Sequence, residues 1–246
     1  MITVKHISKS FGDVQAVKDV SLVAENGKIT ALLGANGAGK TTSMRMIYAL
    51  ITPATGVVTV DGINSTENPV AARARMGVLP DARGLYLRLT ARENMAYFGR
   101  LQGMNEADIK RRSDELVSRL GMEKFADRQT DGFSQGQRVK VAIARALLHD
   151  PQNILLDEPT NGLDVMSTRA IREFLREEKA RGKCILFSSH VMQEVSAVCD
   201  EITVIDAGAV TAKGTEAELL SLSGENNLED AFVSLVTTKS MAGGDS

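Results

Sequence analysis

The sequence lacks long hydrophobic runs and an excess of basic charge. Its longest purely apolar stretches are four to six residues, far short of the roughly 20 that a membrane-spanning helix needs. The net charge is −2 at pH 7, so no general electrostatic attraction draws the chain to nucleic acid. These two absences argue against a membrane-spanning protein and against a nucleic-acid partner.

Cysteine clusters and a secretory pattern are also missing. Cys184 and Cys199 form neither a C-x-x-C pair nor part of a Cys/His cluster, so we expect buried free thiols rather than a disulfide or a zinc site. Residues 1–30 contain no basic segment followed by an apolar one, which leads us to expect a cytoplasmic protein. With 246 residues, the chain is long enough for one large α/β domain or two small ones.

The most informative stretch that is present is Gly34-Ala35-Asn36-Gly37-Ala38-Gly39-Lys40-Thr41, which fits the P-loop pattern G-x-x-x-x-G-K-[ST]. Its glycines allow the backbone to aim N–H groups at phosphates, Lys40 supplies a cation, and Thr41 is placed to ligate Mg²⁺. A short buried strand is predicted over residues 28–33 and a helix over 42–51, with its N-terminus toward the anion. The alternative is a glycine-rich turn with a chance lysine. The flanking elements favour a nucleotide site, formed by Gly34, Asn36, Gly37, Ala38, Gly39, Lys40, Thr41 and Thr42.

The spacing of apolar residues divides the remaining chain into regions of predicted strand and predicted helix. Residues 1–33 and 56–62 alternate like antiparallel strands, with Ile2, Val4 and His6 expected on one face. The region from about 82 to 152 is predicted to be a helical insertion. After Pro151 short apolar strands alternate with helices, which predicts a parallel, buried sheet with helical crossovers. The expected fold is a P-loop α/β core with an N-terminal antiparallel β subdomain and an inserted helical subdomain, all within one domain over 1–246 that ends in a helical tail at about 215–240.

The strand 154–156 ends in two carboxylates, Asp157 and Glu158. A strand tip beside a P-loop is where an aspartate of the Walker B type holds Mg²⁺ through its water shell, and this role suits Asp157. Glu158 points differently and could orient or deprotonate an attacking water. The alternative is an ordinary solvated strand end, and the P-loop upstream favours the functional interpretation.

Shortly before this strand, Phe133-Ser134-Gln135-Gly136-Gln137 resembles the signature motif of ATP-binding cassette ATPases. The usual family form is Leu-Ser-Gly-Gly-Gln, so Phe133 and Gln135 differ while Ser134 and Gly136 are kept. From the residues alone, Ser134 and Gln137 form a capping box that begins a helix ending before Asp150. The resemblance adds that Ser134, Gly136 and Gln137 bind nucleotide, with the helix N-terminus and the Ser134 hydroxyl addressing a γ-phosphate.

Further motifs occur in family order, so the resemblance covers nearly the whole chain. Phe11 matches the aromatic residue that stacks on adenine, with a core phenylalanine as the open alternative. Asn161-Gly162-Leu163-Asp164 matches the D-loop, which in the family crosses the dimer interface, and Asp164 is expected at the nucleotide site. His190 matches the switch histidine that contacts the γ-phosphate. His6 and His149 have no such support and receive no role.

One position departs from the family pattern. A glutamine normally follows the strand after the first hairpin and reaches Mg²⁺ and the attacking water, whereas this chain has Asp81. A further negative charge beside Asp157 and Glu158 would either tighten Mg²⁺ binding or favour protonation of one acid. The expected metal residues are therefore Thr41, Asp81 and Asp157.

The resemblance implies the ATP-hydrolysing subunit of an exporter. Two chains would bind ATP head to tail as a homodimer, between Lys40 and Thr41 of one and Ser134 and Gly136 of the other, with Glu158, His190 and Lys40 as catalytic groups. Residues 80–86 and 227–232 are similar to exporter ATPases of the sodium-extrusion and antibiotic-resistance kind, so sodium or a small solute is the expected cargo. Separate transmembrane permease subunits would hold the chain at the cytoplasmic face of the cell membrane. Their docking patch is expected at Leu85, Tyr86, Leu87 and Leu89, for which local core packing is an equal alternative.

Two other functions stay open at this point. A soluble cassette ATPase acting on ribosomes or DNA would be expected to carry a second cassette, a long coiled coil or a basic stripe, and the sequence has none of these. A regulatory nucleotide-binding module with little turnover is kept open by Asp81. ATPase activity of the isolated protein separates the regulatory module from the other two, and co-purification with a membrane protein separates the exporter from the soluble ATPase.

Overall fold

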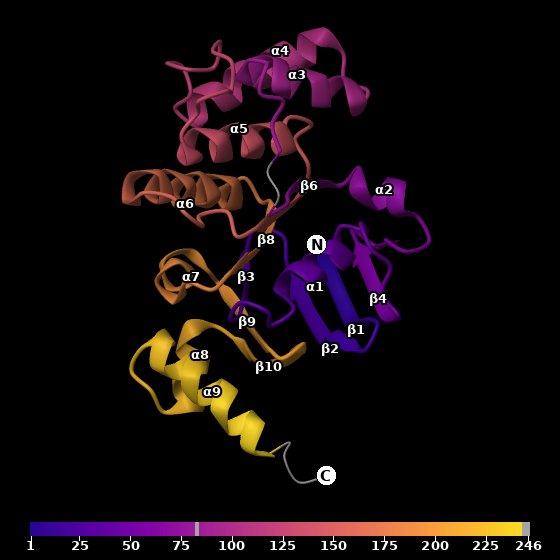
Figure 1. Ribbon diagram of the computed structural model, residues 1–246, viewed down its shortest axis with the longest axis vertical. Helices are drawn as coiled ribbons and strands as arrows, with labels where there is room; N and C mark the ends of the chain where they lie inside the picture. Colours follow the sequence, from indigo (N-terminus) through magenta and orange to yellow (C-terminus); the bar gives the residue numbers. More distant parts are fainter. Residues whose placement is uncertain (82–83, 243–246) are drawn as a thin grey trace.

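A single mixed sheet runs through the middle of the structure, a computed structural model that describes residues 1–81 and 84–242 (Figure 1). Within these residues the strands lie in the order β5-β4-β1-β2-β10-β9-β3-β8-β7-β6. The P-loop strand β3 is therefore central, and the strands on either side of it come from the C-terminal half of the chain. The mixed sheet and its helices confirm the predicted α/β fold.

The parallel part of the sheet carries the ends of the strands that matter for the site. It consists of strands β3 (Ile29–Leu33), β6 (Met76–Leu79), β7 (Asn153–Asp157), β8 (Cys184–Ser189) and β9 (Glu201–Asp206). Every residue of β3, β7 and β8 is buried, as expected for near-continuous apolar strands covered on both faces. The sequence pattern did not reveal β10 (Ala209–Gly214), which pairs antiparallel with β9.

The antiparallel part consists of β1 (Ile2–Phe11), β2 (Val14–Ala24), β4 (Thr55–Val60) and the short β5 (Ile63–Asn64). Here the prediction that His6 shares a face with Ile2 and Val4 was wrong. His6 has a φ of +49°, and the pairing of β1 shifts register between Val4 and Ile7. The irregularity turns His6 to solvent and puts Ile7 into the core, because an extra residue in one strand reverses the facing of those that follow.

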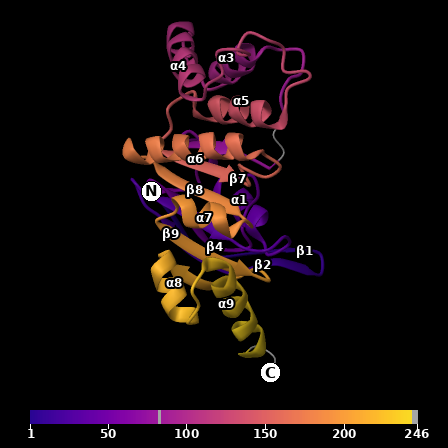
Figure 2. The same cartoon turned by 90° about the vertical axis from the view of Figure 1, so that its left-hand side faces the viewer.

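Helices cover both faces of the sheet (Figure 2). α1 (Lys40–Ile47) lies on one face, and α6 (Val165–Ala180) and α7 (Met192–Val198) lie on the other. α1 is shorter than predicted, since Ile51 lies beyond its end. Gly182 follows the end of α6 in the left-handed conformation (φ +79°), which glycine adopts readily at this position after a helix.

Successive apolar side chains of β3 belong to two different buried clusters, one on each face of the sheet. Ile29, Ala31 and Leu33 of β3 belong to one buried cluster with residues of α5 to α7. Leu32 belongs to a second cluster, with residues of α1 and the antiparallel strands. Alternate side chains of a strand point to opposite faces, so β3 holds both layers together and fixes where the P-loop begins.

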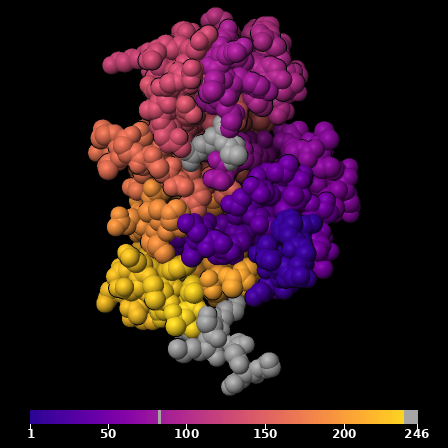
Figure 3. All heavy atoms as spheres, viewed as in Figure 1, coloured from indigo at the N-terminus to yellow at the C-terminus, as the bar shows by residue number. Residues whose placement is uncertain are grey.

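Most of the remaining helices lie at the two ends of the molecule (Figure 1). In the space-filling view, the region between β6 and β7 forms one end and the C-terminal region forms the other (Figure 3). Between β6 and β7 the chain forms α3 (Ala91–Leu101), α4 (Glu106–Arg119) and α5 (Gln135–Leu147), while α2 (Pro69–Arg73) precedes β6. The C-terminal helices are α8 (Glu216–Ser223) and α9 (Leu228–Ala242). Among the helices of residues 1–81 and 84–242, none combines the length and the apolar character needed to cross a membrane.

Candidate functional site

The P-loop connects the end of β3 to the beginning of α1 and lies against β2. Gly39, the N-cap residue of α1, has a φ of +102°, a conformation that residues with a side chain rarely adopt. A β-carbon added there would come within 2.6 Å of the Ala16 carbonyl oxygen. Glycine is therefore required both by the turn and by the close approach of β2. The first N–H groups of α1 consequently face the space above the loop.

Lys40 is almost fully buried (5% exposed) and has only oxygen atoms as partners. Its Nζ donates to the carbonyl oxygens of Gly34 (2.8 Å) and Ala35 (3.1 Å). The same ammonium lies 3.2 Å from Glu158 Oε1. Lys40 thus joins the P-loop to the end of β7.

Asp157 and Glu158 lie at the end of β7, where β8 runs alongside. The strand register pairs Asp157 with Ser188, and the Ser188 hydroxyl donates to Asp157 Oδ1 at 2.5 Å. The Thr41 hydroxyl donates to the same oxygen at 3.4 Å. Asp157 Oδ2 is buried and has no hydrogen-bond partner among the described residues.

The electrostatics of Asp157 follow from this burial. Desolvation raises the pKa of Asp157 above its ordinary value, and the hydrogen bonds from Ser188 and Thr41 oppose the rise only in part. The negative charges of Asp81 and Glu158 add to it. A cation beside Asp157 would relieve both the desolvation and the repulsion between carboxylates.

Glu158 is held by the elements on either side of it. Its backbone has a φ of +49°, which costs of order 1–3 kcal/mol for a residue other than glycine. Its N–H donates to the Ser188 hydroxyl (3.0 Å), and its Oε2 lies 3.0 Å from His190 Nδ1. Two residues further on, the buried Thr160 hydroxyl donates to the buried Glu194 of α7. The glutamate, the loop after it and the segment carrying His190 therefore form one connected network.

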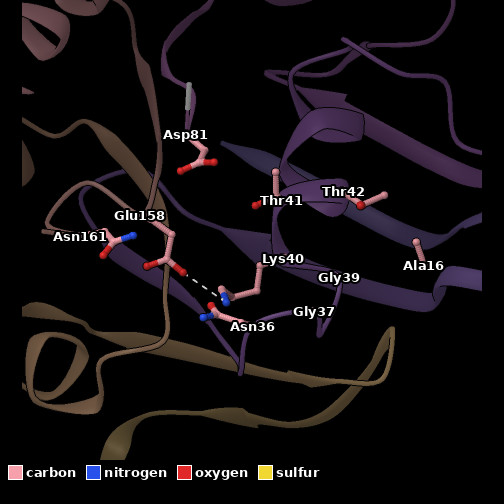
Figure 4. A pocket seen from close by; sticks show the side chains of 10 residues that line it. All are labelled: Ala16, Asn36, Gly37, Gly39, Lys40, Thr41, Thr42, Asp81, Glu158 and Asn161. Atoms are coloured by element: carbon pink, nitrogen blue, oxygen red, sulfur yellow. Dashed lines mark ion pairs between the residues drawn. The ribbon is translucent and has the colours of Figure 1, made fainter. Parts of the chain in front are cut away.

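Lys40 and Glu158 border a cavity of about 300 Å³, whereas Asp157 and His190 are not among its lining residues. Figure 4 shows the side chains of Lys40, Thr41, Asp81, Glu158 and Asn161 around a common space, with the ion pair between Lys40 and Glu158 drawn as a dashed line. The rest of the lining comes from the P-loop and from the β2 strand beside it: Ala16, Asn36, Gly37, Gly39 and Thr42. Residues predicted from motifs far apart in the sequence are thus brought to one place.

The residues of the α5 motif lie elsewhere and are not part of this cavity lining. Ser134 is exposed and forms the predicted capping box with Gln137, which is confirmed at the N-terminus of α5. Gly136 is buried, and a β-carbon there would come within 2.5 Å of the Ser167 hydroxyl in α6. Close packing between α5 and α6 therefore favours glycine here, because a β-carbon would displace the Ser167 hydroxyl.

Asp164 is exposed and caps α6. Its carboxylate accepts hydrogen bonds from the backbone N–H (2.8 Å) and the hydroxyl (2.7 Å) of Ser167. These bonds lower the pKa of Asp164, so it is charged at neutral pH. Within one chain it contacts this helix N-terminus rather than the cavity.

Phe11 lies near the tip of the β1–β2 hairpin and is 51% exposed. The alternative that it is a core phenylalanine was therefore wrong. The Lys9 Nζ lies 5.8 Å from the centre of its ring, the arrangement of a cation–π contact. A ring presented to solvent remains available to a planar ligand.

The loop after β6 borders a second cavity of about 250 Å³, lined by Asp81, Gly84, Leu85, Leu87, Gln135 and Arg138. Tyr86 and Leu87 are 49% and 45% exposed, whereas Leu85 packs against the core. The Tyr86 ring meets the ring of Tyr97 edge-on at 5.1 Å. Asp81 therefore borders both cavities, one at the P-loop and one at the helical region.

A magnesium ion fits this site on the evidence of its unpaired buried oxygen. Asp157 Oδ2 has no hydrogen-bond partner within residues 1–81 and 84–242, and the Thr41 hydroxyl lies beside the same carboxylate. No cluster of three or more His, Cys, Asp or Glu side chains suited to a metal occurs in residues 1–81 and 84–242. Mg²⁺ typically keeps several waters and takes one or two protein ligands together with phosphate oxygens. Such a sparse donor set is what Asp157 and Thr41 offer.

Sequence reasoning missed several residues of this site. Ser188 contacts the carboxylate of Asp157 and the backbone N–H of Glu158. Thr160 and Glu194 tie the following loop to α7, and Ala16 forms part of the cavity wall. Of these, only Ser188 had a usable signal, because a polar residue near the end of an apolar strand needs a partner.

Comparison with known proteins places this site in a family. The model for ABC transporters matches residues 17–161. The ABC transporter ATP-binding protein NatA of Bacillus subtilis is 48% identical, over 95% of this chain and 97% of that protein. The Nod factor export ATP-binding protein I of Rhizobium meliloti is 40% identical, over 87% of this chain and 64% of that protein. A solved dimeric bacterial ABC transporter cassette superimposes with a TM-score of 0.80 at 27% identity, covering 87% of this chain and 98% of that one. The extent of these matches shows that the chain belongs to the ABC transporter family, as an ATP-binding subunit with the ABC ATPase fold.

Proposed function

We propose that the chain hydrolyses ATP as the motor subunit of an exporter for sodium or another small solute. The observation that carries the proposal is the cavity where the P-loop and the end of β7 meet, because its cation, hydroxyls and carboxylates are the groups that phosphoryl transfer requires. The identity with NatA over nearly the whole chain supports a role in transport. Sodium as the cargo rests on the resemblance of residues 80–86 and 227–232 to sodium-extrusion ATPases.

The phosphates of ATP would be bound by the P-loop. The backbone N–H groups from Asn36 to Thr42 and the N-terminus of α1 supply donors and a partial positive charge. Lys40 would redirect its ammonium from the loop carbonyls toward the outer phosphates while keeping Glu158 within reach. Phe11, exposed on its hairpin, would stack on the adenine ring.

The metal residues would be Thr41, Asp157 and Asp81. When bound, Mg²⁺ supplies charge neutralisation at the phosphate oxygens and orients them. Thr41 would hold the ion by its hydroxyl and Asp157 through a water at its unpaired Oδ2. Asp81, at the edge of the same cavity, would sense the ion with a carboxylate in place of the usual amide.

Water activation would fall to Glu158. Its carboxylate borders the cavity, and the ion pair with Lys40 and the contact with His190 fix both of its oxygens. Glu158 would accept a proton from the attacking water, and His190 would hold the γ-phosphate. General base catalysis of this kind contributes about 10²- to 10⁴-fold.

A second copy of the chain would complete the site. Ser134, Gly136, Gln137 and Asp164 lie outside the cavity of their own chain, and the exposed N-terminus of α5 is suited to a phosphate from outside. Two copies facing head to tail would each lend these groups to the other. Each chain would act as one nucleotide-binding domain over 1–246, with its helical subdomain at about 82–152 and its helical tail at about 215–240.

Separate permease subunits would hold the chain at the cytoplasmic face of the membrane. The cavity beside Leu85 and Leu87, with the half-exposed Tyr86 next to it, would accept a short helix of the permease. Leu89 is partly buried and would anchor this loop by packing against the rest of the protein. Because Asp81 borders both cavities, movement of this loop would link the permease to the nucleotide site. No nucleic-acid partner is proposed.

Two measurements test this function. The isolated chain is expected to hydrolyse ATP, and expression with its native genomic neighbours is expected to allow co-purification with a membrane protein of several spans. Absence of turnover would favour the regulatory module that Asp81 left open. Turnover without any membrane partner would favour a soluble ATPase.

A further inference from the structure

We propose that Ser188 is a positioning residue that presets Asp157 for the metal of the nucleotide site. This inference rests on the function proposed above, in which Asp157 holds Mg²⁺ through a water. Ser188 is completely buried in β8. The strand register places it directly beside Asp157 of β7. Its hydroxyl is therefore held by two adjacent strands rather than by a loop.

The Ser188 hydroxyl joins the two strand-end carboxylic residues through one atom. It donates to Asp157 Oδ1 at 2.5 Å and accepts from the backbone N–H of Glu158 at 3.0 Å. A hydroxyl has a single proton to donate, so that proton is committed to Asp157. The same atom thus orients the side chain of one residue and stabilises the left-handed backbone of the next.

The two oxygens of Asp157 are used differently. Oδ1 accepts from Ser188 at 2.5 Å and from Thr41 at 3.4 Å, whereas Oδ2 is buried without a partner among the described residues. If Thr41 turns its hydroxyl to the metal, Ser188 is the donor that remains on Oδ1. Ser188 then holds the carboxylate by one oxygen and leaves the other for the water shell of the ion.

If Ser188 had only a structural role, its replacement would change the stability of the protein but not its response to Mg²⁺. Removing the hydroxyl also leaves the N–H of Glu158 without its acceptor, so any variant is expected to melt at a lower temperature. Loss of stability alone would not alter how nucleotide binding depends on Mg²⁺. Residues that orient a metal ligand typically cost about 10- to 100-fold in metal affinity when they are changed. The Mg²⁺ dependence of nucleotide binding therefore separates the two roles.

The experiment measures binding of trinitrophenyl-ATP to the full chain by fluorescence, first in EDTA and then across a Mg²⁺ titration. In Ser188→Ala the affinity in EDTA is expected to equal that of the wild type, while the Mg²⁺ concentration at half-effect rises about 10-fold or more. Ser188→Thr keeps the hydroxyl and is expected to keep most of the response. Ser65→Ala is the matched control, because Ser65 is also buried (1% exposed) and its hydroxyl has no hydrogen-bond partner in the part of the chain that the structure describes.

Each other result has a defined meaning. A folded Ser188→Ala variant with the wild-type Mg²⁺ response would overturn the role of Ser188 and leave the proposed function standing. A wild-type chain whose nucleotide binding ignores Mg²⁺ would instead overturn the metal role of Asp157. If Ser188→Ala does not fold, Ser188→Cys retains the size with only a weak donor. The same shift is expected there, and an unshifted response would count against the proposal.

Discussion

The P-loop cavity and the N-terminus of α5 carry the two motif-bearing surfaces of the proposed nucleotide site, and they differ in what holds them. At the cavity, Lys40, Asp157 and Glu158 are at most 9% exposed. They contact one another or Ser188 across the ends of three adjacent strands. At α5, Ser134 is exposed, and within residues 1–81 and 84–242 its hydroxyl accepts a hydrogen bond only from the backbone N–H of Gln137, which closes the capping box within its own turn.

This difference shows which surface is prearranged by its own chain. The cavity groups are fixed by the packed sheet and need only a ligand. The α5 groups lie outside the cavity lining, with Ser134 held by the helix cap and Gly136 packed against α6, so a ligand shared with a second copy would complete them. Substitutions in each surface test this difference, beginning with the one that should reduce ATP hydrolysis most.

Glu158→Gln is expected to bind ATP and to lower its hydrolysis by about 10²- to 10⁴-fold, because an amide cannot accept the proton of water. The unhydrolysed nucleotide should keep two copies together, so a dimer is expected by size-exclusion chromatography with ATP and Mg²⁺. Glu173→Gln is the control, an exposed carboxylate on α6 that pairs with Arg176. Near-normal turnover in Glu158→Gln would exclude Glu158 as the general base.

A mixture of two inactive variants is expected to regain ATP hydrolysis if the two surfaces of a site come from different chains. Lys40→Ala removes the cation that would bind the outer phosphates in the cavity. Ser134→Glu places a negative charge where the γ-phosphate would lie. A mixed dimer then retains one intact pair of surfaces, so an equal mixture should recover about a quarter of the wild-type rate by random pairing.

The control for this mixture carries both substitutions in one chain. Mixed with Lys40→Ala, that double variant leaves no intact pair, and no recovery of ATP hydrolysis is expected. If the first mixture also stays inactive while heterodimers are detected, the head-to-tail arrangement is contradicted.

Asp81→Ala is expected to slow ATP hydrolysis by about 10-fold, an effect of the size seen for residues that support a metal site. The loss should be smaller than for Glu158→Gln because Asp81 is exposed and only borders the cavity. Steady-state turnover at several Mg²⁺ concentrations measures it, with Asp13→Ala in the exposed β1–β2 turn as the control. Unchanged turnover would remove Asp81 from the mechanism.

The smallest effect is expected at Asp150, which links the end of α5 to the rest of the fold. Burial alone would raise the pKa of Asp150, but the hydrogen bond from Lys183 and the charges of Arg112 and Arg181 outweigh it and lower the pKa. A lowered carboxyl pKa stabilises the fold above the ordinary value of about 3.9, and this stabilisation is lost as the pH falls through the lowered pKa.

Asp150→Asn should therefore destabilise the protein at neutral pH by less than about 1 kcal/mol, because the Asp150 side chain is 44% exposed and its ion pairs are screened. Asparagine tolerates the φ of +53° at this position, so the backbone should be unaffected. Thermal unfolding at pH 7 is expected to show the difference, which should shrink below about pH 4. A difference that does not change with pH would contradict the electrostatic explanation.

Features set by neighbouring residues could be predicted well. The capping box of Ser134 and Gln137 depends on contacts within three positions and was found as predicted. Where the pattern depended on another strand, prediction failed. His6 was assigned to the wrong face because the register shift that turns it outward involves β2 and β4.

The candidate site shows the same division. The P-loop and the end of β7 carry recognisable motifs, so Lys40, Thr41, Asp157 and Glu158 could be named in advance. Ser188 belongs to no motif, and its contact with Asp157 joins residues 31 positions apart through the pairing of β7 with β8. The contact between Thr160 and Glu194 likewise depends on how α7 packs after its strand.

The chemical groups of the candidate site could be recognised from short segments of the chain. A phosphate-binding loop, a strand ending in two acids and a helix cap are each encoded in a few consecutive residues. Tertiary structure alone decided which groups meet. The parallel register of β3, β8 and β7 brings three strand ends to one edge of the sheet, since side chains separated along the chain become neighbours only through the pairing of strands. In that register one oxygen of Asp157 accepts a hydrogen bond from Ser188, and the other has no partner among the described residues.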